Sequence, residues 1–95
     1  MSEPAPDLGT VIIELFGVPS LRAGRRRVVV FAGTLEEAIH SLANECPGLI
    51  DQVVASGRLM PAYRVSLNGL RFITDPATPL VPGDSLVLVA ADAGG

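Results

Sequence analysis

The sequence predicts an α+β domain in which one main helix lies on one face of a mixed sheet of four to five strands. Two observations lead to this fold class. Short runs rich in β-branched residues alternate with turn residues, and a single segment has the periodicity of an amphipathic helix. The apolar stripe of a helix and one face of a sheet both need burial, so packing one on the other is the simplest arrangement. With 95 residues, we expect one domain and no second core.

Two strands are predicted before the helix, at residues 10–16 and 26–32. Both runs are rich in β-branched residues, and Gly17-Val18-Pro19-Ser20 ends the first of them. The segment between the runs is short enough for a hairpin and carries Gly24 as a second turn residue. We therefore expect the two strands to pair directly with each other.

The main helix is predicted to begin after Thr34 and to end at Pro47-Gly48. Thr34 and Glu37 have the spacing of a capping box, in which the hydroxyl and the carboxylate each bond to a free backbone amide. Proline cannot continue a helix, so the pattern ends there. The apolar positions recur at helical spacing and share one face: Leu35, Ala38, Ile39, Leu42, Ala43 and Cys46.

Further strands are predicted after the helix. Residues 49–56 are expected to add a short helical turn, and residues 63–67 alternate between apolar and polar, as in a strand with one wet face. Asn68-Gly69 is a strong hairpin signal, so residues 70–73 should fold back on that strand. Residues 74–82 contain three prolines and are predicted as a loop, with a tight turn at Pro82-Gly83-Asp84. The last strand is predicted at residues 85–90, which completes the order of a β-grasp fold.

The composition excludes several function classes. A net charge of −3 argues against binding of nucleic acid. One cysteine and one histidine cannot supply a metal quartet or a set of nucleophile, base and orienting residue. His40 falls on the polar face of the helix, and Cys46 falls on the apolar face, where cysteine behaves as a small hydrophobe. We expect no metal site, no bound cofactor and no catalytic residues of the usual kind.

The sequence also predicts the location and the organisation of the protein. No run approaches the ~20 apolar residues that a membrane-spanning helix needs, and residues 1–9 lack the apolar core of a signal peptide. We therefore expect a cytoplasmic protein with no membrane partner. The predicted organisation is a flexible leader at residues 1–9, a β-grasp domain at residues 10–90 and a C-terminal tail at residues 91–95.

The tail offers a different chemistry. Its sequence is Ala91-Asp92-Ala93-Gly94-Gly95, and an extended chain of this length reaches ~20 Å from the last strand. Glycines have no Cβ, so the backbone can pass through a narrow channel. An α-carboxylate is ionised at neutral pH and is a poor electrophile, so it reacts only after activation, for example as an acyl-adenylate. The alternative is a chance Gly-Gly ending in a glycine-rich chain.

Three sequence features together resemble the ThiS/MoaD-type β-grasp sulfur carriers, which are relatives of ubiquitin. The features span residues 10–95 and are Leu67-Asn68-Gly69, then Leu80-Val81-Pro82-Gly83-Asp84-Ser85-Leu86-Val87, then the final Gly94-Gly95. The resemblance implies that an ATP-dependent enzyme of the ubiquitin-activating type adenylates Gly95, and that a sulfurtransferase step then forms a thiocarboxylate. It further implies delivery of the sulfur to an accepting synthase subunit in molybdenum cofactor biosynthesis, or to cysteine or another sulfur metabolite. Such a carrier is a protein co-substrate and not an enzyme.

A partner surface is predicted on the sheet face that the helix leaves uncovered. Both faces of the last strand are apolar, and one helix covers only one face of a sheet. We expect Val87, Val89, Phe16 and Phe72 to contact the partner, together with the tail residues Asp92, Ala93 and Gly94. Alternatively, any one of these residues is apolar only because strands commonly carry apolar side chains, and it contacts no partner.

Two other functions fit the sequence as well. The first is a ubiquitin-like modifier that is joined to target proteins through Gly95. The second is a β-grasp module that only binds partners and whose tail has no chemical role. The fate of Gly95 in the presence of ATP and an activating enzyme distinguishes the three.

Overall fold

The computed structural model of the chain describes residues 9–91. The predicted leader and tail therefore lie almost entirely outside the described residues. The elements in chain order are β1 (Thr10–Leu15), α1 (Val18–Ala23), β2 (Arg27–Phe31), α2 (Leu35–Glu45), the 3-10 helix η1 (Pro47–Leu49), β3 (Val54–Ala55), β4 (Arg58–Leu59), β5 (Tyr63–Leu67), β6 (Arg71–Ile73) and β7 (Ser85–Ala90).

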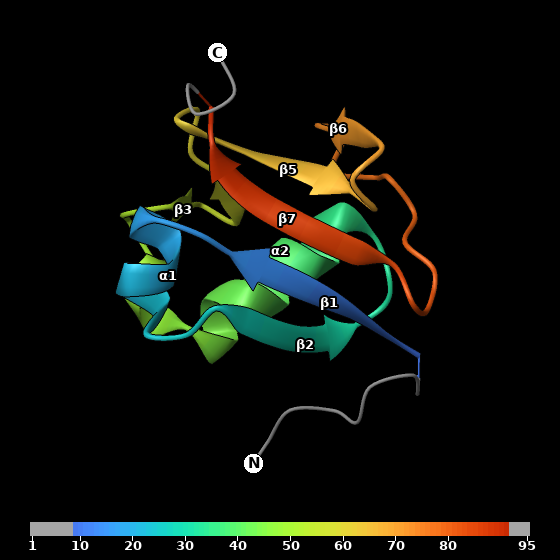
Figure 1. Cartoon of the computed structure of the whole chain (residues 1–95), viewed down its shortest axis with the longest axis horizontal. Helices are drawn as coiled ribbons and strands as arrows, with labels where there is room; N and C mark the ends of the chain where they lie inside the picture. Colours follow the sequence, from blue (N-terminus) through green and yellow to red (C-terminus); the bar gives the residue numbers. More distant parts are fainter. Residues whose placement is uncertain (1–8, 92–95) are drawn as a thin grey trace.

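The main sheet has five strands in the order β2-β1-β7-β5-β6. The last strand, β7, lies in the middle and runs parallel to β1, whereas the other neighbouring strands are antiparallel. Strands β3 and β4 form a separate small hairpin. Figure 1 shows α2 crossing behind the main sheet, with β1 and β7 in front of it. The predicted mixed sheet with one main helix is confirmed.

Helix α2 begins with the predicted capping box. The Glu37 amide donates to Thr34 Oγ1 at 3.2 Å, and the Thr34 amide donates to Glu37 Oε1 at 2.9 Å. The proline-rich loop supplies two further acceptors, because the Leu35 and Glu36 amides donate to the carbonyls of Thr78 and Pro76. The first amides of a helix have no partner inside it, so these bonds hold the loop against the start of α2.

The hydrophobic core lies between α2 and one face of the sheet. Along β1 and β7 the buried residues alternate with partly exposed ones, which is the pattern of a sheet covered on one side. The core is apolar throughout and includes Val11, Ile13, Leu15, Val28, Val30, Leu35, Ala38, Ile39, Leu42, Leu49, Val53, Val65, Leu86 and Leu88.

The connection between β1 and β2 differs from the prediction. The two strands pair as an antiparallel hairpin, but a short helix, α1, lies between them in place of a simple turn. Gly17 precedes α1 with φ 64°, and Gly24 ends it in the left-handed conformation with φ 76°. Helix α1 has six residues, which is less than two turns. Its apolar pattern therefore does not repeat often enough to be recognised in the sequence. Pro19 is buried, whereas Leu21 is 80% exposed.

The segment after α2 also differs from the prediction. A helical turn was expected within residues 49–56, but η1 is at Pro47–Leu49 and β3 begins at Val54. Proline fits the first position of a helical turn because it needs no amide donor there, so Pro47 both ends α2 and begins η1. Leu49 and Val53 from this segment are fully buried.

Gly48 fixes the distance between η1 and α1. A Cβ built on Gly48 would overlap the backbone carbonyl oxygen of Arg22 in α1. The obstacle is backbone and not the end of a flexible side chain, so a larger residue forces the two segments apart. Only glycine lets η1 approach α1 this closely.

We predict that Gly48→Ala lowers the free energy of unfolding by about 1–3 kcal/mol, the range of an overpacking substitution. Urea denaturation followed by circular dichroism measures the loss. Gly33→Ala is the comparison variant, because a Cβ there meets the flexible Glu37 side chain and costs no more than its capping bond to the Thr34 amide, about 1 kcal/mol. Equal losses in the two variants would contradict the role given to the Arg22 carbonyl.

Candidate functional site

The face of the sheet opposite α2 is the candidate functional site, and we call it the open face. Cross-strand register and alternation place side chains from all five strands on it. They are Ile12, Glu14, Arg27, Val29, Phe31, Arg64, Ser66, Phe72, Ser85, Val87 and Val89. The view in Figure 1 looks onto this face, since α2 lies behind it.

The predicted partner residues on the sheet all lie on or beside the open face. Val87 and Val89 are partly exposed, whereas Phe16 and Phe72 are 52% and 54% exposed. Ser66 pairs with both Val87 and Phe72, so these side chains share one row across β7, β5 and β6. Leu15 pairs with Leu88, which brings the next residues, Phe16 and Val89, beside each other. The structure thus gathers the four apolar residues into one region.

The position where the chain leaves the sheet is well defined. Ala90 at the end of β7 pairs with Tyr63, and the Ala91 amide donates to the Ala62 carbonyl at 2.6 Å. We call this point the tail root. The partners of the tail root lie on the β5 side, because the pairing of β1 with β7 ends at Leu15 and Leu88. The predicted site residues Asp92, Ala93, Gly94 and Gly95 lie outside the described residues.

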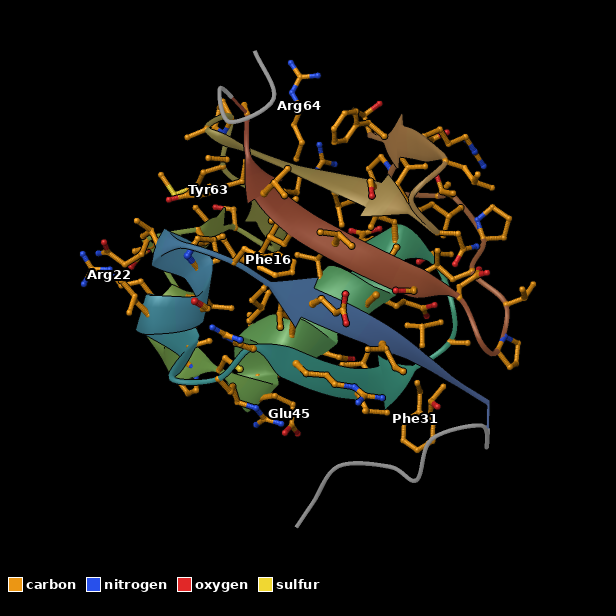
Figure 2. The ribbon with its side chains drawn as sticks, viewed as in Figure 1. Phe16, Arg22, Phe31, Glu45, Tyr63 and Arg64 are labelled. Atoms are coloured by element: carbon orange, nitrogen blue, oxygen red, sulfur yellow. The ribbon has the colours of Figure 1, made fainter. Side chains whose placement is uncertain are left out.

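Arg64 belongs to the open face and was not among the predicted site residues. It pairs with Val89 across β5 and β7 and is exposed. Figure 2 shows its side chain pointing away from the ribbon at the end of the sheet where β7 ends. The alternation of residues 63–67 assigned Arg64 to the wet face of a strand. The sequence pattern does not show which strand pairs with residues 63–67, so the closeness of Arg64 to the tail root was not predictable.

Side-chain hydrogen bonds join the turn residues Asn68 and Asp84, and we call these contacts the lock. The Asn68 side chain donates to Asp84 Oδ1 at 2.9 Å and accepts from the Ser85 amide at 2.8 Å. Asp84 Oδ2 accepts from the Val81 amide at 2.9 Å, which closes the turn before β7. These contacts join the β5–β6 turn to the start of β7. Asn68-Gly69 and Gly83-Asp84 therefore position the central strand and carry no chemistry of their own.

The other candidate residues occupy structural positions. His40 is exposed on α2, and Cys46 is 2% exposed within the core. Within residues 9–91 no three metal-binding side chains come together. A mainly apolar cavity of about 240 Å³ lies between α2, β4 and β5, and its lining includes no histidine or cysteine. No helix of the described part of the chain could cross a membrane.

We predict that Asn68→Gly lowers the free energy of unfolding by about 1–2 kcal/mol, because the bonds to Asp84 and Ser85 are lost. Asn68 has φ 55° and Gly69 has φ 68°, as a hairpin turn with two left-handed residues requires. Glycine keeps this backbone conformation, so Asn68→Gly isolates the side-chain bonds, and Asn68→Ala should lose about 1 kcal/mol more. Thermal and urea unfolding of both variants measure the difference. A fully stable Asn68→Gly protein would show that the lock has no energetic role.

Several solved structures resemble the chain over most of its length. A crystal structure of small archaeal modifier protein 1 from Haloferax volcanii is 27% identical with a TM-score of 0.77, and the match covers 92% of this chain and all of that one. Another crystal structure of the H. volcanii protein is 26% identical with a TM-score of 0.72, covering 84% of this chain and 94% of that one. No protein-family model and no curated protein sequence matches the chain.

A more distant structure shares the fold. The solution structure of small archaeal modifier protein 1 from Methanosarcina acetivorans is 18% identical with a TM-score of 0.72, over 92% of this chain and 97% of that one. At this identity the likeness shows the fold alone. Together the neighbours confirm the predicted ubiquitin-like β-grasp fold and the resemblance to small carrier and modifier proteins of the ThiS/MoaD type.

Proposed function

We propose that this protein is a sulfur carrier whose C-terminal Gly95 is adenylated and then converted to a thiocarboxylate. One observation carries the proposal: on a ubiquitin-like fold, the central strand β7 leads within five residues to Gly94-Gly95. The sheet anchors the tail root at Ala90 and Ala91 through bonds to β5 and its flank. From this anchored point, residues 92–95 provide the length of chain that would enter the site of another enzyme.

The chemistry needs an activating enzyme that uses ATP. The Gly95 carboxylate attacks the α-phosphorus of ATP, the bond to the β-phosphate breaks, and pyrophosphate leaves. A sulfide or persulfide sulfur then attacks the acyl carbon of the adenylate, the carbon–oxygen bond to AMP breaks, and AMP leaves. A persulfide donor also needs a thiol that cleaves its sulfur–sulfur bond. The product is a thiocarboxylate, which donates its sulfur to an accepting synthase.

The positions of His40 and Cys46 support a passive role in this chemistry. Cys46 is buried in the core, and His40 lies exposed on α2, on the side of the sheet opposite the open face. A catalytic group must reach the reacting atoms, and nothing in these positions brings either side chain toward the tail root. The activating enzyme and the sulfur acceptor therefore supply the catalytic groups, and this protein is their co-substrate in the cytoplasm. The acceptor would be a molybdopterin synthase subunit, or an enzyme that forms cysteine or another sulfur metabolite.

The open face is the proposed docking surface for these partners. Phe16, Val87, Val89 and Phe72 form an apolar strip that runs from the tail root across the sheet. Exposed apolar residues that gather in one region are typical of a protein interface. A partner that covers this strip also holds the tail root, since Val89 is one residue from Ala90. A partner that docks on the strip is therefore also the protein to which Gly95 is presented.

A second function is favoured by the names of the structural neighbours, which are modifier proteins. In that role Gly95 would be joined to an amine of a target protein after the same adenylation. The acyl carbon would bond to nitrogen in place of sulfur, and AMP would leave in both reactions. The two functions therefore share the activation step and differ in the nucleophile that follows.

We predict that the intact protein gains the mass of one oxygen-to-sulfur exchange when it is incubated with ATP, a cognate activating enzyme and a sulfur source. Intact-protein mass spectrometry measures the change, and tandem spectra locate it at Gly95. A ladder of isopeptide-linked products would support the modifier function. An unmodified mass under all these conditions would contradict both functions.

Two variants of the tail sharpen this test. One additional residue after Gly95 should abolish thiocarboxylation without changing the melting temperature, because the added residue carries the only α-carboxylate. Gly94→Ala should slow activation at unchanged stability, because a Cβ narrows the passage of the tail. Thiocarboxylation of the extended protein without trimming would overturn the role of Gly95.

We predict that Phe16→Ala raises the KM for the activating enzyme about fivefold, as the loss of one exposed apolar contact of roughly 1 kcal/mol would do. Leu21→Ala is the matched control, since Leu21 is a more exposed apolar residue that lies on α1, off the open face. Initial rates of pyrophosphate release measure KM. Equal effects of the two substitutions would argue against docking at the open face.

A further inference from the structure

We infer that Arg64 binds a carboxylate on the partner protein, next to the apolar strip at the tail root. The inference rests on the proposed function and adds to it the charge that the partner must carry. Arg64 thereby has a binding role, whereas the sequence pattern predicts only a solvent-facing position in a strand. Three observations support it: the position of Arg64, the distribution of charge over the molecule, and the surroundings of the guanidinium group.

The position of Arg64 places a cation beside the residues that a partner would cover. Arg64 pairs with Val89, and the next pair along the strands is Tyr63 with Ala90, at the tail root. Directly paired residues on adjacent strands have Cβ atoms about 5 Å apart, so the stem of Arg64 starts beside Val89. Figure 2 shows Arg64 at this end of the sheet, projecting from β5. A protein that docks on Val89 therefore meets the guanidinium group.

The charges of the domain are divided between its two sides. Within residues 9–91 seven arginines balance seven acidic residues, and Glu36, Glu37 and Glu45 lie exposed on α2 behind the sheet, where Arg25 pairs with Glu45. The open face carries the opposite balance, with Arg27 and Arg64 against Glu14 alone. Glu14 pairs with Arg27, two strands away from Arg64. An acidic partner surface is thus attracted to the open face and repelled from α2.

The surroundings of Arg64 leave its guanidinium group available. Arg25, by contrast, forms an ion pair with Glu45 inside the domain, with Nη1 and Oε1 3.9 Å apart. For Arg64 no ion pair is present within residues 9–91. Its pairing neighbour Val89 is apolar, and so is the strip beyond it. A guanidinium group with an apolar border matches a carboxylate whose own surroundings are apolar, because both become shielded from water on docking.

A protein partner explains these features better than a nucleic acid does. Two arginines on a face with one acidic residue, in a protein of net charge −3, do not neutralise a row of phosphates. An apolar strip beside one arginine instead resembles the centre of a protein interface, where arginine and aromatic residues are common. The occupant is therefore the activating enzyme, through an acidic side chain beside apolar ones.

The experiment measures adenylation of the full chain by the activating enzyme at low and high salt. Arg64→Gln should raise KM about fivefold at low salt with kcat unchanged, and the difference should shrink at high salt, as expected for an exposed charge pair. Arg64→Lys keeps the charge and should restore most of the affinity. Arg22→Gln is the matched control, because Arg22 is also exposed but lies on α1, outside the main sheet. It should change KM less than twofold, or roughly 0.4 kcal/mol by the relation between affinity and free energy.

Four outcomes overturn the inference. An equal KM for Arg64→Gln and the wild type shows that Arg64 does not contact the partner, while thiocarboxylation of the wild type still supports the proposed function. An equal rise for Arg22→Gln shows only a general effect of charge. A similar, non-additive rise for Asp92→Asn assigns the carboxylate to the tail of this chain and not to the partner. A wild-type protein that is not adenylated contradicts the proposed function and this inference together.

Discussion

One helix can cover only one face of a five-stranded sheet, and most features of this domain follow from that limit. The apolar face of α2 covers the inward-facing residues of β1 and β7, which include Ile13, Leu15, Leu86 and Leu88. The opposite face keeps Val87 and Val89 partly exposed in the centre of the sheet. A central strand with one buried and one uncovered apolar face is stable in a domain of this size and is also a ready surface for a partner.

The parallel pairing of β1 and β7 determines where the tail begins. It brings the first and last strands of the domain side by side in the middle of the sheet. The chain consequently leaves the sheet just beyond the end of β1, with Ala90 paired to Tyr63 and Ala91 bonded to Ala62. The Asn68–Asp84 contacts fix the opposite end of β7, so both ends of this strand are held. The proposed docking surface thereby includes β7, and the proposed reactive tail follows directly from this strand.

The elements that were predictable are those whose signal is local and repeated. The capping residues Thr34 and Glu37, the apolar stripe of α2 and the Asn68-Gly69 turn were all read correctly, because each depends on residues within a few positions of one another. Helix α1 and η1 were not predicted. Both are shorter than two turns, and η1 depends on a close approach of Gly48 to the Arg22 carbonyl that no local pattern contains.

The sequence by itself determined the fold class, the uncovered apolar strand and the terminal Gly94-Gly95, since periodicity and composition are properties of the chain. It also predicts no metal or nucleophile chemistry, because the chain has one histidine and one cysteine. Only the tertiary structure decided which residues surround the tail root. Strand order and register come from pairing between distant segments, so the placement of Arg64 beside Val89 exists only once β5 has paired with β7.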